Sequence, residues 1–180
     1  VYKRQGKIFA DQGVDPSKVS GDIEMVAYLQ GYGDTTTDEI NAAIQAAPDA
    51  FISVGMATTF FTQQLNAAGI EFSDIDSFTK SNGEAITSGK LVYLAGKYSS
   101  SVGPAFALIM NAINGNIVRD ADGNAVSISQ NYQVATDEAT FDEFYKTDNG
   151  DNPIYNKETL DKIIGDSVTC DDITKLVESK

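Results

Sequence analysis

Few side chains in this chain of 180 residues could carry out chemistry, because it contains no histidine and a single cysteine. Histidine is the commonest general base, the commonest metal ligand and the usual activator of a nucleophilic Ser or Cys. Cys170 stands in Val-Thr-Cys-Asp-Asp, where Thr169 is predicted to cap a helix that begins at the cysteine. The carboxylates of Asp171 and Asp172 oppose a reactive thiolate there. We therefore expect a structural cysteine and a protein that is not an enzyme.

Polar and aromatic residues suited to binding follow two apolar segments. Lys97 and Tyr98 come after the apolar segment 91–95 and precede three serines, and Tyr32 lies in a Gly-Tyr-Gly loop after the segment 23–29. A tyrosine ring can stack on a small molecule, and a lysine can bind one of its oxygen atoms. The alternatives are an ordinary loop tyrosine for Tyr32, and for Lys97 a hinge lysine paired with an acid.

Three further candidates occupy the corresponding positions of neighbouring segments. Gly55 and Met56 follow the apolar segment 50–54, where the backbone N–H groups of a helix start could face a ligand. The alternative is a tight turn with a core methionine. Thr79 follows the segment 70–78, at the corresponding strand end.

Charge and motifs exclude several other classes of function. The chain has 26 acidic and 13 basic residues, a formal net charge of -13, which repels nucleic acid and anionic membranes. The sequence Gly31-Tyr32-Gly33 lacks the third glycine of a dinucleotide fingerprint, and there is no Gly-Lys-Ser/Thr phosphate loop. We expect no nucleic-acid partner, no cofactor and no metal.

The order of apolar segments predicts an α/β fold. Strands are expected at 23–29, 50–54, 70–78 and 91–95, and helices at 39–47, 57–68, 82–88 and 99–114. This alternation is typical of a mostly parallel sheet with helices on both faces. Ligands bind outside the carboxyl ends of such strands, where all six candidate residues lie.

The C-terminal third has a different pattern. A hairpin is predicted around Asp122-Gly123, between 117–118 and 125–128, followed by a last strand at 132–135. A helix at 140–145, an acidic loop at 148–153 and two short helices complete the chain.

Four stretches resemble, in order, the second half of type 1 periplasmic binding proteins, the sugar-binding components of ABC transporters. They cover most of residues 6–136 and read PDAFISVGMATTFFTQQLNAAG, IDSFTKSNGEAITSGKL, LVYLAGKYSSSVGPAFALIMNAINGN and SISQNYQVAT. The resemblance implies a three-layer sandwich lobe whose companion first lobe is largely missing. It also implies a C-terminal lobe at 6–96, a hinge crossing and first-lobe helix at 97–124, and a last strand with a helical tail at 125–180. The helix would then leave an apolar patch exposed.

The resemblance also bears on the ligand. The family's Asn-Asp pair falls on Val54-Gly55, its aspartate on Thr79, and its glutamine on Lys97 or Gly96. A lysine at that last position is similar to the nucleoside-binding relatives, the basic membrane lipoproteins. The implied ligand is a small polar solute of the sugar or nucleoside class.

The implied function is solute capture between two lobes, followed by presentation to an ABC permease. Such a protein is expected to be a monomer in the periplasm or outside the cell, held by a lipid anchor if the missing N-terminus carries one. The alternative is the effector-binding core of a lactose-repressor-family regulator, which the acidic charge and the long tail disfavour. An enzyme of the doubly wound type is a third class, disfavoured by the absent histidines and phosphate loops.

The first five residues, Val1-Tyr2-Lys3-Arg4-Gln5, resemble the translation of a transposon-end adapter used in sequencing libraries. Our hypothesis is that residues 1–5 are a scar and that the native sequence resumes near Gly6. A genuine basic helix start is the alternative.

Overall fold

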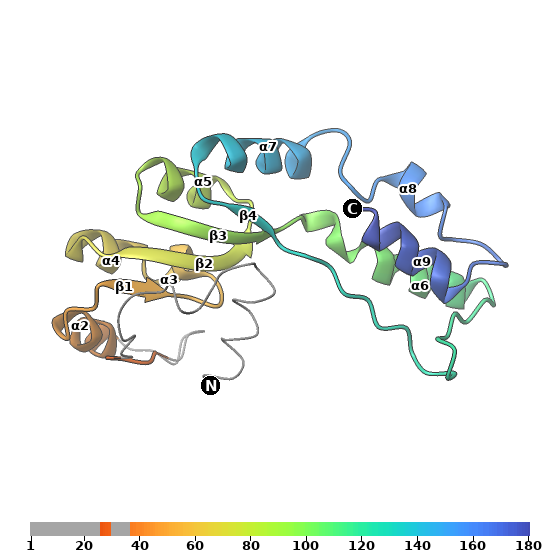
Figure 1. The fold of residues 1–180 in the computed structure, drawn as a ribbon, viewed down its shortest axis with the longest axis horizontal. Helices are drawn as coiled ribbons and strands as arrows, with labels where there is room; N and C mark the ends of the chain where they lie inside the picture. Colours follow the sequence, from red (N-terminus) through yellow and green to blue (C-terminus); the bar gives the residue numbers. More distant parts are fainter. Residues whose placement is uncertain (1–25, 30–36) are drawn as a thin grey trace, which may run out of the picture.

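The computed structural model describes residues 26–29 and 37–180, which form two bodies joined by narrow connections (Figure 1). The first, the sheet body, contains strands β1 to β4 and helices α2 to α5 and α7. Its elements are α2 (Thr37–Gln45), β1 (Ala50–Ile52), α3 (Ala57–Phe60), α4 (Thr62–Ala68), β2 (Glu71–Ser77), α5 (Lys80–Thr87), β3 (Leu91–Lys97), β4 (Gln133–Ala135) and α7 (Glu138–Asn149).

The second, the helical body, is built from helices far apart in the sequence. It contains the 3-10 helix η2 (Ser99–Val102), α6 (Gly103–Ile113), α8 (Lys157–Asp161) and α9 (Cys170–Glu178). The loop between α6 and β4 extends along this body in Figure 1.

The sheet confirms the predicted α/β fold with a mostly parallel sheet. Its strand order is β1-β2-β3-β4; β1, β2 and β3 are parallel, and β4 is antiparallel to β3. The register places Asp76 beside Gly96 and Ser77 beside Lys97. The carboxyl ends of two neighbouring strands therefore bring these residues to one edge of the sheet.

One face of the sheet carries the core of the sheet body. Phe72, Leu94 and Ala135 are fully buried there and share one hydrophobic cluster with residues of α2, α3, α5 and α7. The opposite face exposes Ile52 and Tyr93, which register with Ser73. The described helices cover one face, and a third layer is not found among the described residues.

The helical body has a separate, smaller core. Ala107 of α6, Ile163, and Ile173 and Val177 of α9 form its buried cluster. Fully buried Asn111 holds the tail to α6, since its Nδ2 donates to the carbonyl of Ile163 at 2.9 Å and its Oδ1 accepts the N–H of Gly165 at 2.8 Å. The C-terminal tail thereby covers one side of α6.

Most predicted elements of the described residues form within a few residues of their expected ends, with three differences. The predicted helix 57–68 is interrupted at Phe61, whose backbone leaves helical geometry with φ −126°. The buried ring of Phe61 packs on the ring of Phe51, and their centroids are 5.3 Å apart. The hairpin at 117–128 keeps its turn, with Gly123 at φ +81°, but its strands reduce to one bridge between Arg119 and Ala125. Two strands without a third partner are marginal in water.

The third difference concerns the first predicted strand, 23–29. Residues 26–29 contain no strand, although Leu29 packs against the core of the sheet body. The remainder of that prediction lies outside the described residues.

Candidate ligand-binding site

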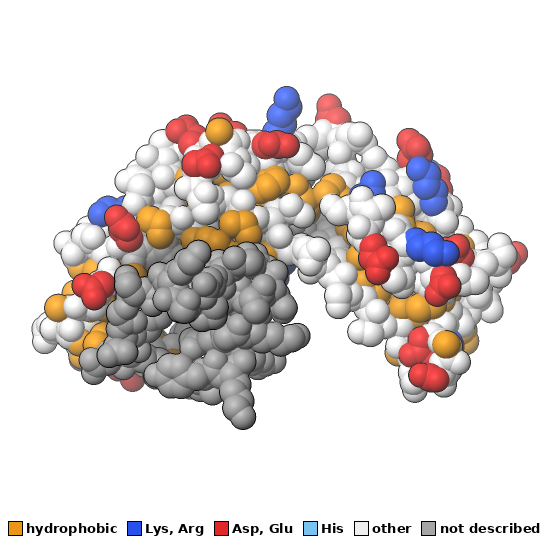
Figure 2. Space-filling view, in the orientation of Figure 1, with side chains coloured by type: hydrophobic (Ala, Val, Ile, Leu, Met, Phe, Trp, Pro, Cys, Tyr) orange, Lys and Arg blue, Asp and Glu red, His pale blue; other side chains and the backbone are white. Residues whose placement is uncertain are grey.

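The carboxyl ends of β2 and β3 point toward the helical body (Figure 1). Figure 2 shows an open hollow beneath the connection between the two bodies, on the side of the molecule drawn there. The carboxyl edge is where ligands bind in open α/β sheets. We therefore built the candidate site from the residues that this edge and the following loops position.

Asp76 and Asn82 form the polar centre of this edge. The Nδ2 of Asn82 donates to Asp76 Oδ2 at 3.0 Å and to the carbonyl of Ser77 at 2.8 Å. The other carboxylate oxygen, Oδ1 of Asp76, accepts the N–H of Ser77 at 2.7 Å. A carboxylate can accept about four hydrogen bonds, so half of the acceptor capacity of Asp76 remains for donors from a ligand or from water.

The amide oxygen of Asn82 is a buried acceptor that lacks a donor among the described residues. Asn82 is fully buried, and its Oδ1 has no hydrogen-bond partner there. Because an unpaired buried acceptor costs about 1–3 kcal/mol, this atom favours a bound water or a ligand hydroxyl.

Thr79 acts as the N-cap of α5. Its backbone is extended and its hydroxyl accepts the N–H of Asn82 at 3.2 Å. This contact fixes the start of α5 and holds Asn82 against Asp76. Thr79 itself is exposed at the edge, so its predicted role in ligand contact stays a prediction.

Gly55 and Met56 lie in the turn between β1 and α3. Met56 has a left-handed backbone with φ +61°, and the N–H of Gly55 donates to Ser53 Oγ at 3.0 Å. The first N–H of α3, that of Ala57, donates to Asp74 Oδ2 at 2.6 Å. This N–H therefore binds an internal carboxylate, whereas the sequence analysis expected such groups to face the ligand.

Asp74 is buried at the centre of this turn. Desolvation raises the pKa of its carboxyl above the ordinary value, and hydrogen bonds with Ser53, Ala57 and Ile75 oppose that rise. A buried carboxylate stabilised by backbone N–H groups fixes the loop after β1. Its role in the described structure is to position that loop.

Lys97 and Tyr98 occupy different environments. Lys97 is exposed at the end of β3, beside Ser77 and one residue beyond Gly96, the partner of Asp76. The half-buried ring of Tyr98 packs against the rings of Phe78 and Phe144, with distances between ring centroids of 5.4 Å and 6.2 Å. Burial raises the pKa of the Tyr98 phenol, and the nearby Glu143 and Asp148 carboxylates raise it further.

The structure thus brings Thr79 and Lys97 to one edge and places Tyr98 in an aromatic cluster beside it. Tyr32 lies outside the described residues. Asp76 and Asn82 are not among the residues predicted from the sequence. The signal was the alternation Phe72-Ser73-Asp74-Ile75-Asp76, which places both aspartates on one face of β2 and ends at the edge.

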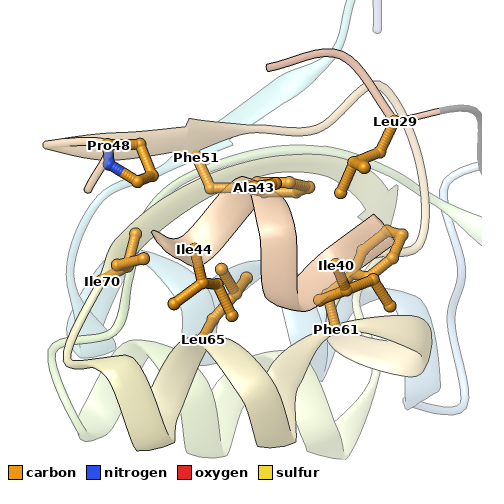
Figure 3. A pocket seen from close by; sticks show the side chains of 9 residues that line it. All are labelled: Leu29, Ile40, Ala43, Ile44, Pro48, Phe51, Phe61, Leu65 and Ile70. Atoms are coloured by element: carbon orange, nitrogen blue, oxygen red, sulfur yellow. The ribbon is translucent and has the colours of Figure 1, made fainter. Parts of the chain in front are cut away.

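A second hollow is apolar and belongs to the core. It lies between α2 and α4 and has a cavity volume of about 20 Å³ (Figure 3). The side chains that line it are Leu29, Ile40, Ala43, Ile44, Pro48, Phe51, Phe61, Leu65 and Ile70. A space of that size holds little more than one water, and water needs polar partners. This hollow is therefore too small and too apolar to hold a polar solute.

Other sites were sought across the described part of the chain. Within residues 26–29 and 37–180, no group of three or more His, Cys, Asp or Glu is placed to hold a metal ion. None of the described helices is long and apolar enough to span a bilayer. Cys170 is half-buried at the start of α9, where Thr169 and Asp172 form a capping box.

Comparisons with known proteins gave no match. No protein-family model, no curated protein and no solved structure is significantly similar to this chain.

Proposed function

We propose that this chain is part of a solute-binding component of an ABC importer, which captures a small polar solute at the carboxyl edge of the sheet. The observation that carries the proposal is the pair Asp76 and Asn82, with exposed Lys97 on the neighbouring strand. Carboxylate, amide and ammonium groups bind hydroxyl, amine and carbonyl groups without bond-making chemistry. The solute would belong to the sugar or nucleoside class, and the protein is not an enzyme.

The exposed side of α6 supports the two-lobed part of the proposal. Five large apolar side chains there are 49–71% exposed, and we call them the α6 stripe: Val102 at the end of η2, Phe106, Ile109 and Ile113 on α6, and Ile117 in the following loop. No charged residue occurs between Ser99 and Val118. An uncharged stripe of this length is typical of a surface that another part of a protein covers.

The finer fold belongs to the same proposal. In the proposed protein the sheet body is the C-terminal lobe of a type 1 periplasmic binding protein, a three-layer sandwich. The α6 stripe then packs against a first lobe encoded upstream. Burying each large side chain of the stripe would stabilise the whole by about 1.5–3 kcal/mol.

The gene upstream of the Gly6 codon tests this architecture. The proposal expects a reading frame for a first α/β lobe preceded by a signal peptide, with a lipobox cysteine if the monomer is lipid-anchored outside the membrane. A helix-turn-helix region in its place would make the chain the sensing core of a repressor. Codons for residues 1–5 in a continuous genomic frame would rule out the adapter scar.

A further inference from the structure

Three chain segments connect the sheet body to the helical body (Figure 1). Each segment makes a contact that restrains its position. The segment after β3 is tied by Asp148 to Ser99, and the segment before β4 by Gln130, whose Nε2 donates to the carbonyl of Ser101 at 2.7 Å. The segment after α7 brings buried Tyr155 onto Gly103, where an added Cβ would lie 2.7 Å from the Tyr155 Cβ.

The contact of Asp148 is the only charged one of these three. Its Oδ1 accepts the backbone N–H of Ser99 at 2.6 Å, and its Oδ2 accepts the Ser99 hydroxyl at 2.9 Å. Asp148 lies in the last turn of α7, in the sheet body, and Ser99 is the first residue of η2, which leads into α6. The Asp148 carboxylate, which belongs to another element, thus accepts two hydrogen bonds at the start of η2. It acts as a charge-assisted cap of that helix.

The hydrophobic cores of the two bodies are separate. Their hydrophobic clusters share no residue within the described part of the chain. The relative position of the bodies therefore depends on the three connections. The connection before β4 is restrained by the neutral hydrogen bond of Gln130, and the connection after α7 by the contact of Tyr155 with Gly103.

We propose that Asp148 is a hinge clamp, which holds the helical body at one angle to the sheet body through Ser99. The clamp is independent of the proposed function, because it acts within this chain whatever molecule the edge binds. Releasing it leaves the contacts of Gln130 and Tyr155 and the packing of the Tyr98 ring as the remaining constraints, so the helical body samples a wider range of angles.

The test measures the distance between two spin labels by pulsed electron paramagnetic resonance. Cys170 provides one site on the helical body, and Thr87→Cys, at the exposed end of α5, provides the other. The otherwise unchanged chain is expected to give one narrow distance distribution. Asp148→Ala is expected to broaden it at least twofold, and Asp142→Ala, which removes an exposed carboxylate from the same helix, to leave it unchanged.

Ser99→Pro is the second variant and decides the case if Asp148→Ala fails to fold. Proline is suited to the first residue of a helix, and Tyr98 already has the extended backbone that a following proline requires. Both donors to Asp148 are then removed, and the same broadening is expected. A narrow distribution in Ser99→Pro, or in a folded Asp148→Ala, overturns the proposal.

Discussion

The two bodies of this molecule are built on different principles. In the sheet body, neighbouring segments of the chain pair as strands and bury a continuous aromatic and aliphatic cluster. In the helical body, side-chain amides of Asn111 and Asn116 bind backbone groups 49 to 54 residues away. The sheet body is therefore specified largely by local patterns, and the helical body by a small apolar core together with a few long-range polar contacts.

The largest expected effect separates the two cores. Leu94→Ala in the sheet body and Ile173→Ala in the helical body each remove a fully buried side chain. Each should lower the free energy of unfolding by about 2–5 kcal/mol. Amide hydrogen exchange is expected to rise mainly in the body that carries the substitution. Equal acceleration in both bodies would show one cooperative unit and end the comparison.

Loss of the polar contacts that attach the tail is expected to lower the free energy of unfolding nearly as much as loss of a buried side chain from its core. Asn111→Ala leaves the carbonyl of Ile163 and the N–H of Gly165 without their partner, at about 1–3 kcal/mol for each buried group. Limited proteolysis should then cut the chain within 157–180. The matched control, Asn114→Ala, changes an exposed asparagine at the end of the same helix and should resist cleavage as the parent does. If Asn111→Ala resisted cleavage as the parent does, the side-chain amide of Asn111 would not be what attaches the tail.

Close packing at the carboxyl edge gives a smaller effect. A Cβ at Gly96 would lie 2.3 Å from the Phe78 ring, so Gly96→Ala is expected to cost about 1–3 kcal/mol by displacing the aromatic cluster. At Gly165, in the helical body, the nearest atom to an added Cβ is 3.9 Å away. Gly165→Ala should change the stability by about 0.5 kcal/mol or less. Urea unfolding of both variants measures the difference, and equal stabilities would contradict the tight packing of the edge.

Two aspartates should give the bodies opposite dependence on pH. The raised pKa of Asp74 means that the folded state holds a proton more tightly than the unfolded state. Its contribution to stability is therefore present below the ordinary value of 3.8 and is lost as the pH rises through the folded pKa. The pKa of Asp172 is lowered by hydrogen bonds from the Thr169 side chain and backbone, so its contribution is lost as the pH falls through the folded pKa.

Urea unfolding from about pH 3 to about pH 7 checks these signs. Asp74→Asn should remove a decline in stability with rising pH, and Asp172→Asn should remove a rise. The same sign for both variants would contradict the difference in their surroundings.

The smallest effect concerns the α6 stripe. Ile109→Ser replaces a side chain that is 59% exposed, so the stability of this chain should change by about 0.5 kcal/mol or less. If an upstream lobe covers the stripe, the same substitution should destabilise the complete protein several times more. Equal effects in the two settings would leave the stripe uncovered.

Much of the sheet body could be predicted from the sequence, because apolar segments bounded by Gly and Asp mark strands and helices directly. The Thr169 cap of α9 was predicted from residue type alone. The interruption at Phe61 could not be, since it depends on a ring that packs on β1. Asn111 gave no signal either, because its partners are backbone groups more than 50 residues away.

The sequence predicted the sheet edge at which Lys97 and Thr79 lie, whereas their contact with a ligand stays a prediction. The carboxyl edge follows from the alternation of strands and helices, which also placed Lys97 and Thr79 there. Asp76 and Asn82 were not predicted, because the predicted ligand contacts all follow the strands, whereas Asp76 lies within β2 and Asn82 within α5. The use of Tyr98 in packing depends on Phe78 and Phe144, which only the fold brings together.

Calorimetric titration of the complete gene product with monosaccharides and nucleosides tests the central claim most directly. The account predicts saturable binding of one solute, without turnover, and an affinity at least about tenfold weaker in Lys97→Ala. Lys90→Ala, at the opposite end of β3, should bind as the parent does. No heat of binding with any sugar or nucleoside, or equal affinities of the two lysine variants, would contradict solute capture at this edge.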